Sequence, residues 1–327
     1  MHPPLARLGS RPTAGATEGG RALGALTGFA VIGVAIAVGY LLARTGLVGA
    51  DARRVFSRTA LFVTNPALLF TVLAGADLGR LFGTPIVVAG ASAVAMATVY
   101  LAVNRLVLRR RLAEATVGAT CAGYVNANNI GIPVAVYLVG DAAASAPVLL
   151  LQLIVFAPVC LTVLDLASGG RPSWRTVAAQ PVRNPIVLAS ALGALVAATG
   201  VDLPPVVLAP LELLGGAAVP LVLMAFGMSL HGARPLEAGH ERADVVLATV
   251  LKVLAMPLVA YLLARFVFGD EGRELLAAVA MAALPTAQNV FLFASRSGHG
   301  ETIARDTILL STVASAPVLF AVSLLLG

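Results

Sequence analysis

The chain has few charged residues. Aspartate, glutamate, lysine and arginine together make up 12% of its 327 residues, against about 25% in an average soluble domain. Hydrophobic residues make up 59%, and the mean hydropathy is +0.93. A soluble fold of this length could not bury so much apolar surface, and a disordered chain would show the opposite balance. These properties exclude an ordinary soluble enzyme and a disordered protein, and they indicate an all-α membrane protein embedded in a lipid bilayer.

Cysteine and histidine are also scarce. Cys121 and Cys160 both lie inside apolar runs, so they offer neither a disulfide framework nor the spacing of a metal site. The four histidines are scattered, and the sequence has no HExxH motif. We therefore expect no metal, no cofactor and no enzymatic site. The net charge of +6 comes from arginines between apolar runs rather than from a basic patch with aromatics, so we expect no nucleic-acid partner.

Ten apolar segments follow an N-terminal tail, residues 1–21, which is rich in Gly, Pro, Arg and Thr and is expected to be disordered. A helix needs about 20 apolar residues to cross a bilayer, and the sixth segment is the shortest of the ten. The predicted spans 1 to 10 are residues 22–43, 55–74, 84–104, 115–139, 146–167, 184–200, 206–230, 243–268, 274–295 and 303–326.

The arginines are divided unevenly between the two sides of the predicted spans. Fifteen lie in or beside the loops that follow odd-numbered spans, and six lie on the other side. Because basic residues are enriched in cytoplasmic loops, odd-numbered loops are predicted to be cytoplasmic and both termini extracytoplasmic. Arginine outnumbers lysine 21 to 1, a bias typical of a GC-rich bacterial genome, so the predicted location is the bacterial inner membrane.

Prolines indicate an internal duplication. Three pairs have similar spacings of 154, 152 and 159 residues and join span n to span n + 5: Pro66 with Pro220, Pro133 with Pro285, and Pro158 with Pro317. Since five is odd, the second half enters the membrane from the opposite side, which gives a 5+5 inverted repeat. We predict repeat 1 at 22–167, a cytoplasmic linker at 168–183 and repeat 2 at 184–327. Chance matching of prolines is the alternative.

Span 4 has a polar centre. Asn126, Asn128 and Asn129 are followed by Gly131 and Pro133, which are predicted to break the helix because proline lacks a donor and clashes with the preceding turn. Amides at membrane depth are costly unless they are paired or solvated. Interrupted backbone at this depth needs protein or a water-filled cavity around it.

Span 9 has the same character, with Pro285 among hydroxyl and amide residues. Each break leaves the N-terminus of a half-helix with unpaired N–H groups and the positive end of its dipole. Two such ends near the midplane attract a carboxylate or another anion. The residues predicted to bind this substrate are Asn126, Asn128, Asn129, Thr286, Gln288 and Asn289. The alternative is that the amides only cap the breaks and join helices.

Few charged residues lie within the spans. Lys252, the only lysine, has three candidate roles in span 8: to offset the C-termini of half-helices, to pair with a carboxylate, or to meet an anionic substrate. The alternative is that it reaches the cytoplasmic interface. Gln152 in span 5 either supports the site or packs, and the same two roles are open for Tyr124. Asp165 and Glu212 lie near span ends and are expected to be solvated.

Three stretches resemble the auxin efflux carrier family, the bacterial relatives of the plant PIN transporters. They are Gly39-Tyr40-Leu41-Leu42 with Thr64-Asn65-Pro66-Ala67-Leu68-Leu69, Asn126 with Gly131-Ile132-Pro133, and Leu284-Pro285-Thr286-Ala287-Gln288-Asn289. The resemblance covers nearly the whole chain after the tail. Asn126 and Asn289 match the polar positions of the family best. Asn128 and Asn129 stand where many members carry glycine and an apolar residue, so the site here is more polar.

The resemblance implies a ten-span fold like that of the sodium/proton antiporters and bile-acid symporters, with crossed, broken helices 4 and 9. It implies a scaffold of spans 1, 2, 6 and 7, a mobile transport domain of spans 3–5 and 8–10, and an elevator-like movement. It also implies a small organic anion as substrate, auxin-like or a dicarboxylate, and a homodimer.

Other functions remain open from the residues alone. A sodium symporter or a cation/proton antiporter on the same scaffold is the main alternative, with Na⁺ or H⁺ as the coupling ion. The sequence shows no pair of deep acidic residues, which argues against an antiporter. An intramembrane enzyme would need a nucleophile, metal ligands or an acid–base pair, and a non-transporting receptor is a further alternative.

Overall fold

The computed structural model describes residues 18–49, 51–76, 79, 83–167, 183–232, 239 and 241–327. Within these ranges the chain is helical and has no β-strand, apart from one antiparallel bridge between Val125 and Thr286. Away from its two ends, a helix pairs its backbone N–H and C=O groups within one segment, which the apolar interior of a membrane requires. Most of the predicted tail and linker lies outside the described residues, although the first helix begins at Glu18, inside the predicted tail.

Helices of the first half coincide with predicted spans 1 to 5, with π-helical turns (η1 to η4, η6) and one 3₁₀ turn (η5) inserted. They are α1 (Glu18–Thr45), α2 (Ala52–Thr59), η1 (Ala60–Thr64), α3 (Asn65–Ala74), α5 (Thr84–Val103), η2 (Asn104–Leu108), α6 (Leu112–Gly123), η3 (Ala127–Gly131), α7 (Ile132–Val134), η4 (Ala135–Val139), η5 (Ala142–Ser145), α8 (Ala146–Leu151), η6 (Gln152–Phe156) and α9 (Ala157–Ala167).

Helices of the second half coincide with predicted spans 6 to 10. They are α11 (Pro185–Thr199), α12 (Pro205–Gly216), α13 (Ala218–Leu230), α14 (Arg242–Val250), η7 (Leu251–Ala255, π-helical), α15 (Met256–Leu262), η8 (Leu263–Phe268, π-helical), α16 (Gly272–Ala282), α17 (Asn289–Ser297) and α18 (Glu301–Leu326).

Six continuous helical stretches of the described chain are long and apolar enough to cross a membrane. They are Ala52–Ala74, Thr84–Leu108, Ala142–Ala167, Pro205–Met228, Arg242–Phe268 and Glu301–Leu326. Three shorter apolar helices lie in predicted spans 1, 4 and 6: Ile32–Thr45, Ala127–Val139 and Pro185–Thr199. These helices support a protein that crosses the membrane several times, and the number of ten spans stays a prediction.

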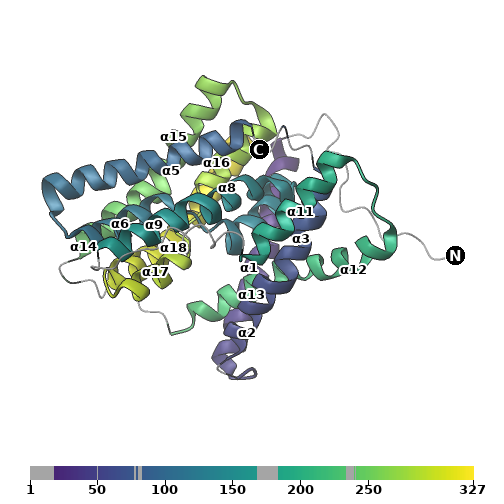
Figure 1. Cartoon of the computed structure of the whole chain (residues 1–327), viewed down its shortest axis with the longest axis horizontal. Helices are drawn as coiled ribbons and strands as arrows, with labels where there is room; N and C mark the ends of the chain where they lie inside the picture. Colours follow the sequence, from purple (N-terminus) through teal and green to yellow (C-terminus); the bar gives the residue numbers. More distant parts are fainter. Residues whose placement is uncertain are drawn as a thin grey trace.

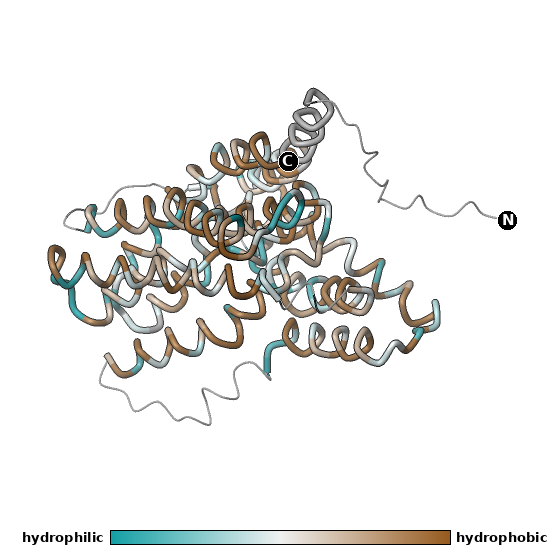
Figure 2. Tube along the Cα trace, turned by 90° about the horizontal axis from the view of Figure 1, so that it is seen from above, coloured by the Kyte–Doolittle hydropathy of each residue, from teal (hydrophilic) through white to brown (hydrophobic). Residues whose placement is uncertain are grey.

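Apolar residues run along nearly all helices (Figure 2), and many large ones, including Phe62, Leu213 and Phe266, are exposed. Exposed apolar surface on this scale is typical of a protein that faces another apolar phase. Several polar side chains show the reverse and are fully buried: Asn65, Ser92, Asp244, Lys252, Thr286, Asp306, Thr307 and Ser311.

The helices form two packing groups (Figure 1). In the first group α1 packs along α13, and α3 packs against α11 and α12. In the second group α5 packs on α6, α15 packs on α5 and α16, and α18 packs on α6, α14 and α16. The groups meet where α1 contacts α18 and η4, and where α13 contacts η3. The first group comprises predicted spans 1, 2, 6 and 7, and the second comprises spans 3–5 and 8–10.

The first group contains two equivalent close approaches. Gly39 of α1 lies so near the backbone of Met224 in α13 that a Cβ would overlap its carbonyl oxygen. Gly193 of α11 lies in the same way against the carbonyl oxygen of Phe70 in α3. Gly39 and Gly193 are 154 residues apart, as are Phe70 and Met224. Span 6 therefore packs on span 2 in the same way as span 1 packs on span 7. The spacing of 154 residues equals that between Pro66 and Pro220.

Candidate functional site

Two helices are interrupted within the second group. α6 ends at Gly123, and the helix resumes with η3 at Ala127. α16 ends at Ala282, and α17 begins at Asn289. Non-helical backbone therefore occurs in the polar parts of predicted spans 4 and 9.

The two interruptions run antiparallel and are joined by a single β-bridge with two backbone hydrogen bonds. The N–H of Asn126 donates to the carbonyl oxygen of Pro285 at 2.8 Å, and the N–H of Ala287 donates to the carbonyl oxygen of Tyr124 at 3.1 Å. Backbone groups in an interruption lack the hydrogen bonds of a helix. Each interruption here supplies hydrogen-bond partners for backbone groups of the other. This pairing fixes the ends of four half-helices at one place in the protein.

The first interruption lies earlier than the sequence predicts. Gly131 and Pro133 are predicted to break span 4, but the structure places Gly131 at the end of η3 and Pro133 in α7, both inside the resumed helix. Pro133 cannot donate to the preceding turn, and the wider π-helical turn of η3 precedes it there. A Cβ at Gly131 would crowd the side chain of Leu284, so glycine allows the two interruptions to approach. Pro285 does lie in an interruption.

A cavity of about 1170 Å³ borders both interruptions, and we call it the amide cavity. Its lining includes Asn126, Asn128 and Asn129 from one segment and Gln288 and Asn289 from the other. These residues form the starts of η3 and α17, so the positive ends of two half-helix dipoles border the same cavity. The structure therefore brings together five of the six residues predicted to bind substrate.

Arginines line the same cavity. Arg53, Arg54 and Arg58 come from α2, and Arg305 comes from α18. No aspartate or glutamate is among the described residues of the lining. In the sequence analysis these arginines serve only to predict the orientation of the chain in the membrane. Arg54 and Arg58 are four residues apart, which is the spacing of neighbours on one face of a helix. Arg305 pairs with Asp306, so Arg53, Arg54 and Arg58 supply most of the positive charge that the lining offers to an anion.

A chain of amides connects the cavity to the first packing group. Nδ2 of Asn65, in α3, donates to Oδ1 of Asn128 at 2.7 Å, and Nδ2 of Asn128 donates to Oδ1 of Asn129 at 2.9 Å. Asn65 is fully buried. It belongs to the Thr64-Asn65-Pro66 stretch that carries the family resemblance, and that stretch is the sequence signal that marks it as a functional candidate.

Asn126 is the N-cap residue of η3. Its Oδ1 accepts a hydrogen bond of 3.0 Å from the N–H of Asn129, as N-cap side chains do. Its Nδ2 is buried and has no hydrogen-bond partner among the described residues. An unsatisfied buried donor costs about 1–3 kcal/mol. A ligand oxygen in the amide cavity would remove this cost.

Thr286 does not lie in the cavity lining, contrary to the sequence prediction. Its side chain is fully buried, and Oγ1 donates to the carbonyl oxygen of Cys121 at 2.8 Å. Its N–H donates to Oγ of Ser311 at 3.1 Å. Thr286 therefore satisfies a carbonyl near the C-terminus of α6 and joins the interruption to α18. The carbonyl partner lies far away in sequence, so the residue pattern does not show this role.

Gln152 and Tyr124 both line the amide cavity. Gln152 is buried, and the ring of Tyr124 packs edge-on against Phe293 with centroids 6.0 Å apart. Glu212 is exposed, Asp165 is half-buried, and neither is part of this lining.

Lys252 lies beside the second interruption but outside the amide cavity. It is fully buried, and Nζ donates to the carbonyl oxygen of Ala282 at 2.8 Å and to Sδ of Met256 at 3.0 Å. Ala282 is the last residue of α16, so the ammonium group lies at the negative end of this half-helix. No carboxylate among the described residues is within ion-pair distance of it. Its burial shows that the alternative of reaching the membrane interface is wrong.

Two buried carboxylates are not singled out by the sequence pattern. Asp244 forms an ion pair of 2.9 Å with Arg110 and accepts a hydrogen bond of 3.0 Å from the hydroxyl of Tyr100. Asp306 pairs with Nε of Arg305 at 2.8 Å. Both acids lie close to the start of a helix, where sequence alone suggests exposure, and packing of α14 and α18 buries them.

Comparisons with known proteins give the family. A model of the family described as "Membrane transport protein" matches residues 25–174 and 170–322. A protein of Rhizobium meliloti (strain 1021) named "Putative malonate transporter" is 26% identical over 289 residues, which cover 86% of this chain and 89% of the relative. An "Uncharacterized transporter" of Methanothermobacter thermautotrophicus is 27% identical over 288 residues, covering 86% of this chain and 92% of the relative.

These matches span most of the chain and confirm the resemblance to the auxin efflux carriers. With its apolar helices, the chain is a multi-pass membrane protein. It belongs to the membrane transport protein family and is a transporter, not an enzyme.

Proposed function

We propose that this protein is a secondary active transporter that moves a small organic anion across the bacterial inner membrane. The amide cavity carries the proposal, because two half-helix N-termini, the unpartnered Nδ2 of Asn126 and four arginines border one space. Helix N-termini and guanidinium groups are the usual partners of carboxylates in proteins. No acidic side chain in the described lining opposes an anion.

A dicarboxylate fits this arrangement. One carboxylate binds at the half-helix N-termini beside Asn126 and Asn289, and the second binds among Arg58 and Arg305. The name of the Rhizobium meliloti relative makes malonate the first compound to test. The cavity volume of about 1170 Å³ exceeds the range of about 300–1,000 Å³ that is usual for ligand pockets, so larger carboxylates of the auxin type also belong in the test.

The two packing groups correspond to the scaffold and the transport domain of an elevator mechanism. In this proposal the second group, which carries both interruptions, moves against α1, α3 and α13 of the first group. The repeated glycine contacts of Gly39 and Gly193 support an inverted repeat, which provides two related arrangements of similar energy. The crossing of helices 4 and 9 is supported by the backbone pairing of their interruptions. A homodimer through the scaffold completes this proposal.

The amide cavity opens toward the loops that follow odd-numbered spans. Its lining includes Arg53 after span 1, Asn184 after span 5 and Gly232 after span 7. With these loops in the cytoplasm and both termini outside, as the arginine bias predicts, this opening supports an inward-facing state in the proposed mechanism.

Transport of Na⁺ or another cation on the same scaffold is the alternative. The four arginines of the lining oppose a cation as the main substrate, while Na⁺ or H⁺ as the coupling ion stays compatible with the amides.

A ligand screen tests the proposal. The thermal stability of the purified protein is measured with malonate, longer dicarboxylates and indole-3-acetate, in sodium or choline buffers and at several pH values. We expect stabilisation by at least one carboxylate, because a ligand that binds only the folded state raises its stability. Radiolabelled counterflow in proteoliposomes then shows whether that compound is carried. Stabilisation by sodium alone, with no carboxylate active, would favour the cation transporter.

A further inference from the structure

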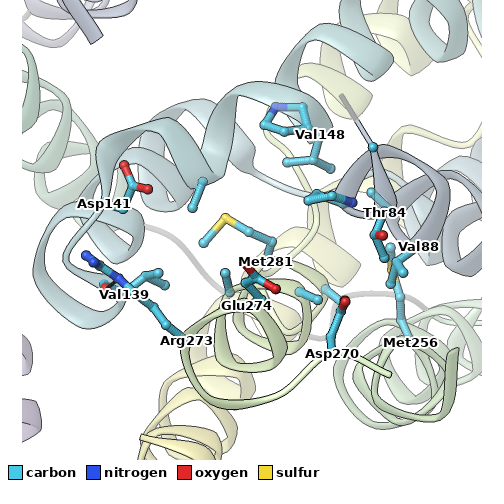
Figure 3. Close-up of a pocket in the computed structure, with 18 of the residues that line it drawn as sticks. Thr84, Val88, Val139, Asp141, Val148, Met256, Asp270, Arg273, Glu274 and Met281 are labelled. Atoms are coloured by element: carbon cyan, nitrogen blue, oxygen red, sulfur yellow. Dashed lines mark hydrogen bonds between the residues drawn. The ribbon is translucent and has the colours of Figure 1, made fainter. Parts of the chain in front are cut away.

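A second cavity of about 510 Å³ lies beside the second interruption, between α5, α8, α15 and α16, and we call it the lysine cavity. Asp141, Arg273 and Glu274 are exposed and lie around it, and Asp270 is half-buried (Figure 3). The lining thus has a charged, exposed part contributed by loops and by the start of α16.

The deep part of the same lining is apolar and buried. It includes Val88, Val148, Met256, Met281 and Ala282, and Figure 3 shows Met281 near Glu274 and Met256 near Asp270. The cavity therefore leads from exposed charged residues into the interior of the second packing group.

Lys252 lies behind this apolar part and is not itself among the residues that line the cavity. The two hydrogen-bond acceptors of Nζ, the carbonyl oxygen of Ala282 and Sδ of Met256, belong to residues that line the lysine cavity. An ammonium group has three donors, and the described residues provide these two acceptors. Water in the cavity would supply a third partner and a route for a proton.

The two cavities belong to opposite sides of the predicted topology. The lysine cavity is lined by Gly83 after span 2, Asp141 after span 4 and Asp270 after span 8. The amide cavity is lined by residues that follow odd-numbered spans. Ala282 separates Lys252 from the interruption that leads to Gln288 and Asn289, so the ends of both cavities meet at one short segment.

We propose that the lysine cavity is a proton pathway and that Nζ of Lys252 binds the proton that is coupled to transport. The lone pair of the neutral amine takes a proton from water in the cavity and becomes an ammonium group, and the reverse step returns the proton to water. No other reactant is needed. This inference rests on the proposed function, since it names the coupling ion for the same substrate site.

The link to the substrate site is the bond to Ala282. A charged donor forms a stronger hydrogen bond than a neutral one, and a cation stabilises the negative end of a helix dipole. Binding of the proton therefore strengthens the hydrogen bond between Nζ of Lys252 and the C-terminus of α16. This helix end adjoins the interruption that positions Gln288 and Asn289. Release of the proton weakens the hydrogen bond.

Other ionisable groups on the elements around Lys252 do not form an ion pair with it among the described residues. They are Tyr100 on α5, Glu114 and Cys121 on α6, Arg242 and Asp244 on α14, Tyr261 on α15, Arg273 and Glu274 on α16, Glu301, Arg305 and Asp306 on α18, and Asp270 in the loop before α16. Asp244 and Asp306 have arginine partners of their own. Lys252 is thus a buried base that forms no ion pair among the described residues, and both of its hydrogen-bond acceptors belong to the cavity lining.

A direct test uses the fact that Lys252 is the only lysine. Protein labelled with ¹³C and ¹⁵N lysine contains a single labelled side chain, so NMR follows its protonation without any substrate. We expect the Cε and Nζ resonances to titrate within the pH range in which transport is measured. Resonances that stay in one protonation state throughout this range would overturn the proposal.

Transport assays test the coupling. Proteoliposomes with wild type, Lys252→Gln and Lys252→Arg are compared for malonate counterflow and for malonate accumulation driven by a pH gradient. Neither replacement exchanges a proton at neutral pH, so we expect both variants to lose gradient-driven accumulation by a much larger factor than counterflow, which needs no net movement of protons. If Lys252 only supports the helix end, Lys252→Arg keeps its charge and retains accumulation, which would overturn the proposal.

The same assays separate this inference from the proposed function. Absence of malonate binding and counterflow in the wild type counts against malonate as the substrate. The NMR titration still decides whether Lys252 exchanges a proton.

Discussion

Nδ2 of Asn65 donates a hydrogen bond of 2.7 Å to Oδ1 of Asn128. Asn65 belongs to α3 in the first packing group, and Asn128 belongs to η3 at the amide cavity in the second. The proposed elevator movement slides these groups past each other and would break this bond. Under that proposal the bond marks the inward-facing arrangement and joins the proposed substrate site to the proposed scaffold.

The first prediction concerns this contact. A protein with Asn65→Cys and Asn128→Cys, in a background with Cys121→Ala and Cys160→Ala, should be cross-linked by mercuric ion and lose transport. Transport should return when a thiol reagent removes the metal, because the cross-link holds the two groups in one arrangement. The two single-cysteine variants are the control. A cross-linked protein that transports at the normal rate would contradict a relative movement at this contact.

The second prediction concerns Asn126. Replacement Asn126→Asp keeps the size and the N-cap acceptor but places a negative charge at the amide cavity. The affinity for a carboxylate should therefore fall by about tenfold or more, since a hydrogen bond to a charged group contributes about 1.5–3 kcal/mol.

The alanine variants Asn126→Ala and Asn289→Ala should abolish uptake. Ligand binding and counterflow measure these effects, and melting temperatures check that the variants fold. Normal transport by both alanine variants would refute the assigned site.

The third prediction concerns the arginines. Arg58→Gln and Arg305→Gln should weaken binding of a dicarboxylate more than binding of a monocarboxylate, because the second carboxylate loses its partner. The matched control is Arg265→Gln, since Arg265 pairs with Glu271 away from the amide cavity. Titrations at low and high salt measure the effect, which salt should reduce. Equal losses for both ligand types would argue against a second carboxylate site.

The fourth prediction concerns the glycine contact of α1. Gly39→Ala places a methyl group on the backbone of Met224, and we expect a loss of about 1–3 kcal/mol, the usual cost of overpacking. Gly33→Ala in the same helix is the matched control, because nothing lies within 4 Å of its Cβ position. Thermal unfolding in detergent measures the difference. Equal melting temperatures for the two variants would contradict the close packing of α1 on α13.

The fifth prediction concerns Asp270, in the loop before α16. Burial, with a contribution from Glu274, raises the pKa of this carboxyl above its ordinary value of 3.8. The folded protein therefore holds the proton more tightly than the unfolded chain, and Asp270 favours folding most below pH 3.8 and less as the pH rises through its folded pKa. Asp270→Asn should thus be more stable than the wild type at neutral pH, and this gain should shrink toward pH 4. Melting curves at several pH values decide it, and a less stable variant at neutral pH would contradict this sign.

The sequence predicts features that depend on local composition. The long apolar stretches predict where the helices lie, and the clustered amides of Asn126 to Asn129 and Gln288–Asn289 predict the polar site. Contacts between distant segments are not local properties, so Asn65 as a partner of Asn128, the carbonyl partner of Thr286 and the arginines of the amide cavity emerge only from the fold.

The position of the first break shows the same limit. Proline chemistry points to Gly131 and Pro133, but the helix is interrupted where backbone pairing with Pro285 and Ala287 is available. The partner segment, and not the nearest helix-breaking residue, therefore decides where the chain unwinds.

The pairing of the two interruptions also has a consequence for biosynthesis. The N–H of Asn126 and the carbonyl oxygen of Tyr124 are bonded only to residues that emerge from the ribosome about 160 positions later. Until that segment has been made, these backbone groups of the first half lack their partners. Assembly of the proposed substrate site is therefore expected to be a late event that requires both halves, and a protein truncated before residue 285 is expected to leave its first half open to chaperones and membrane proteases.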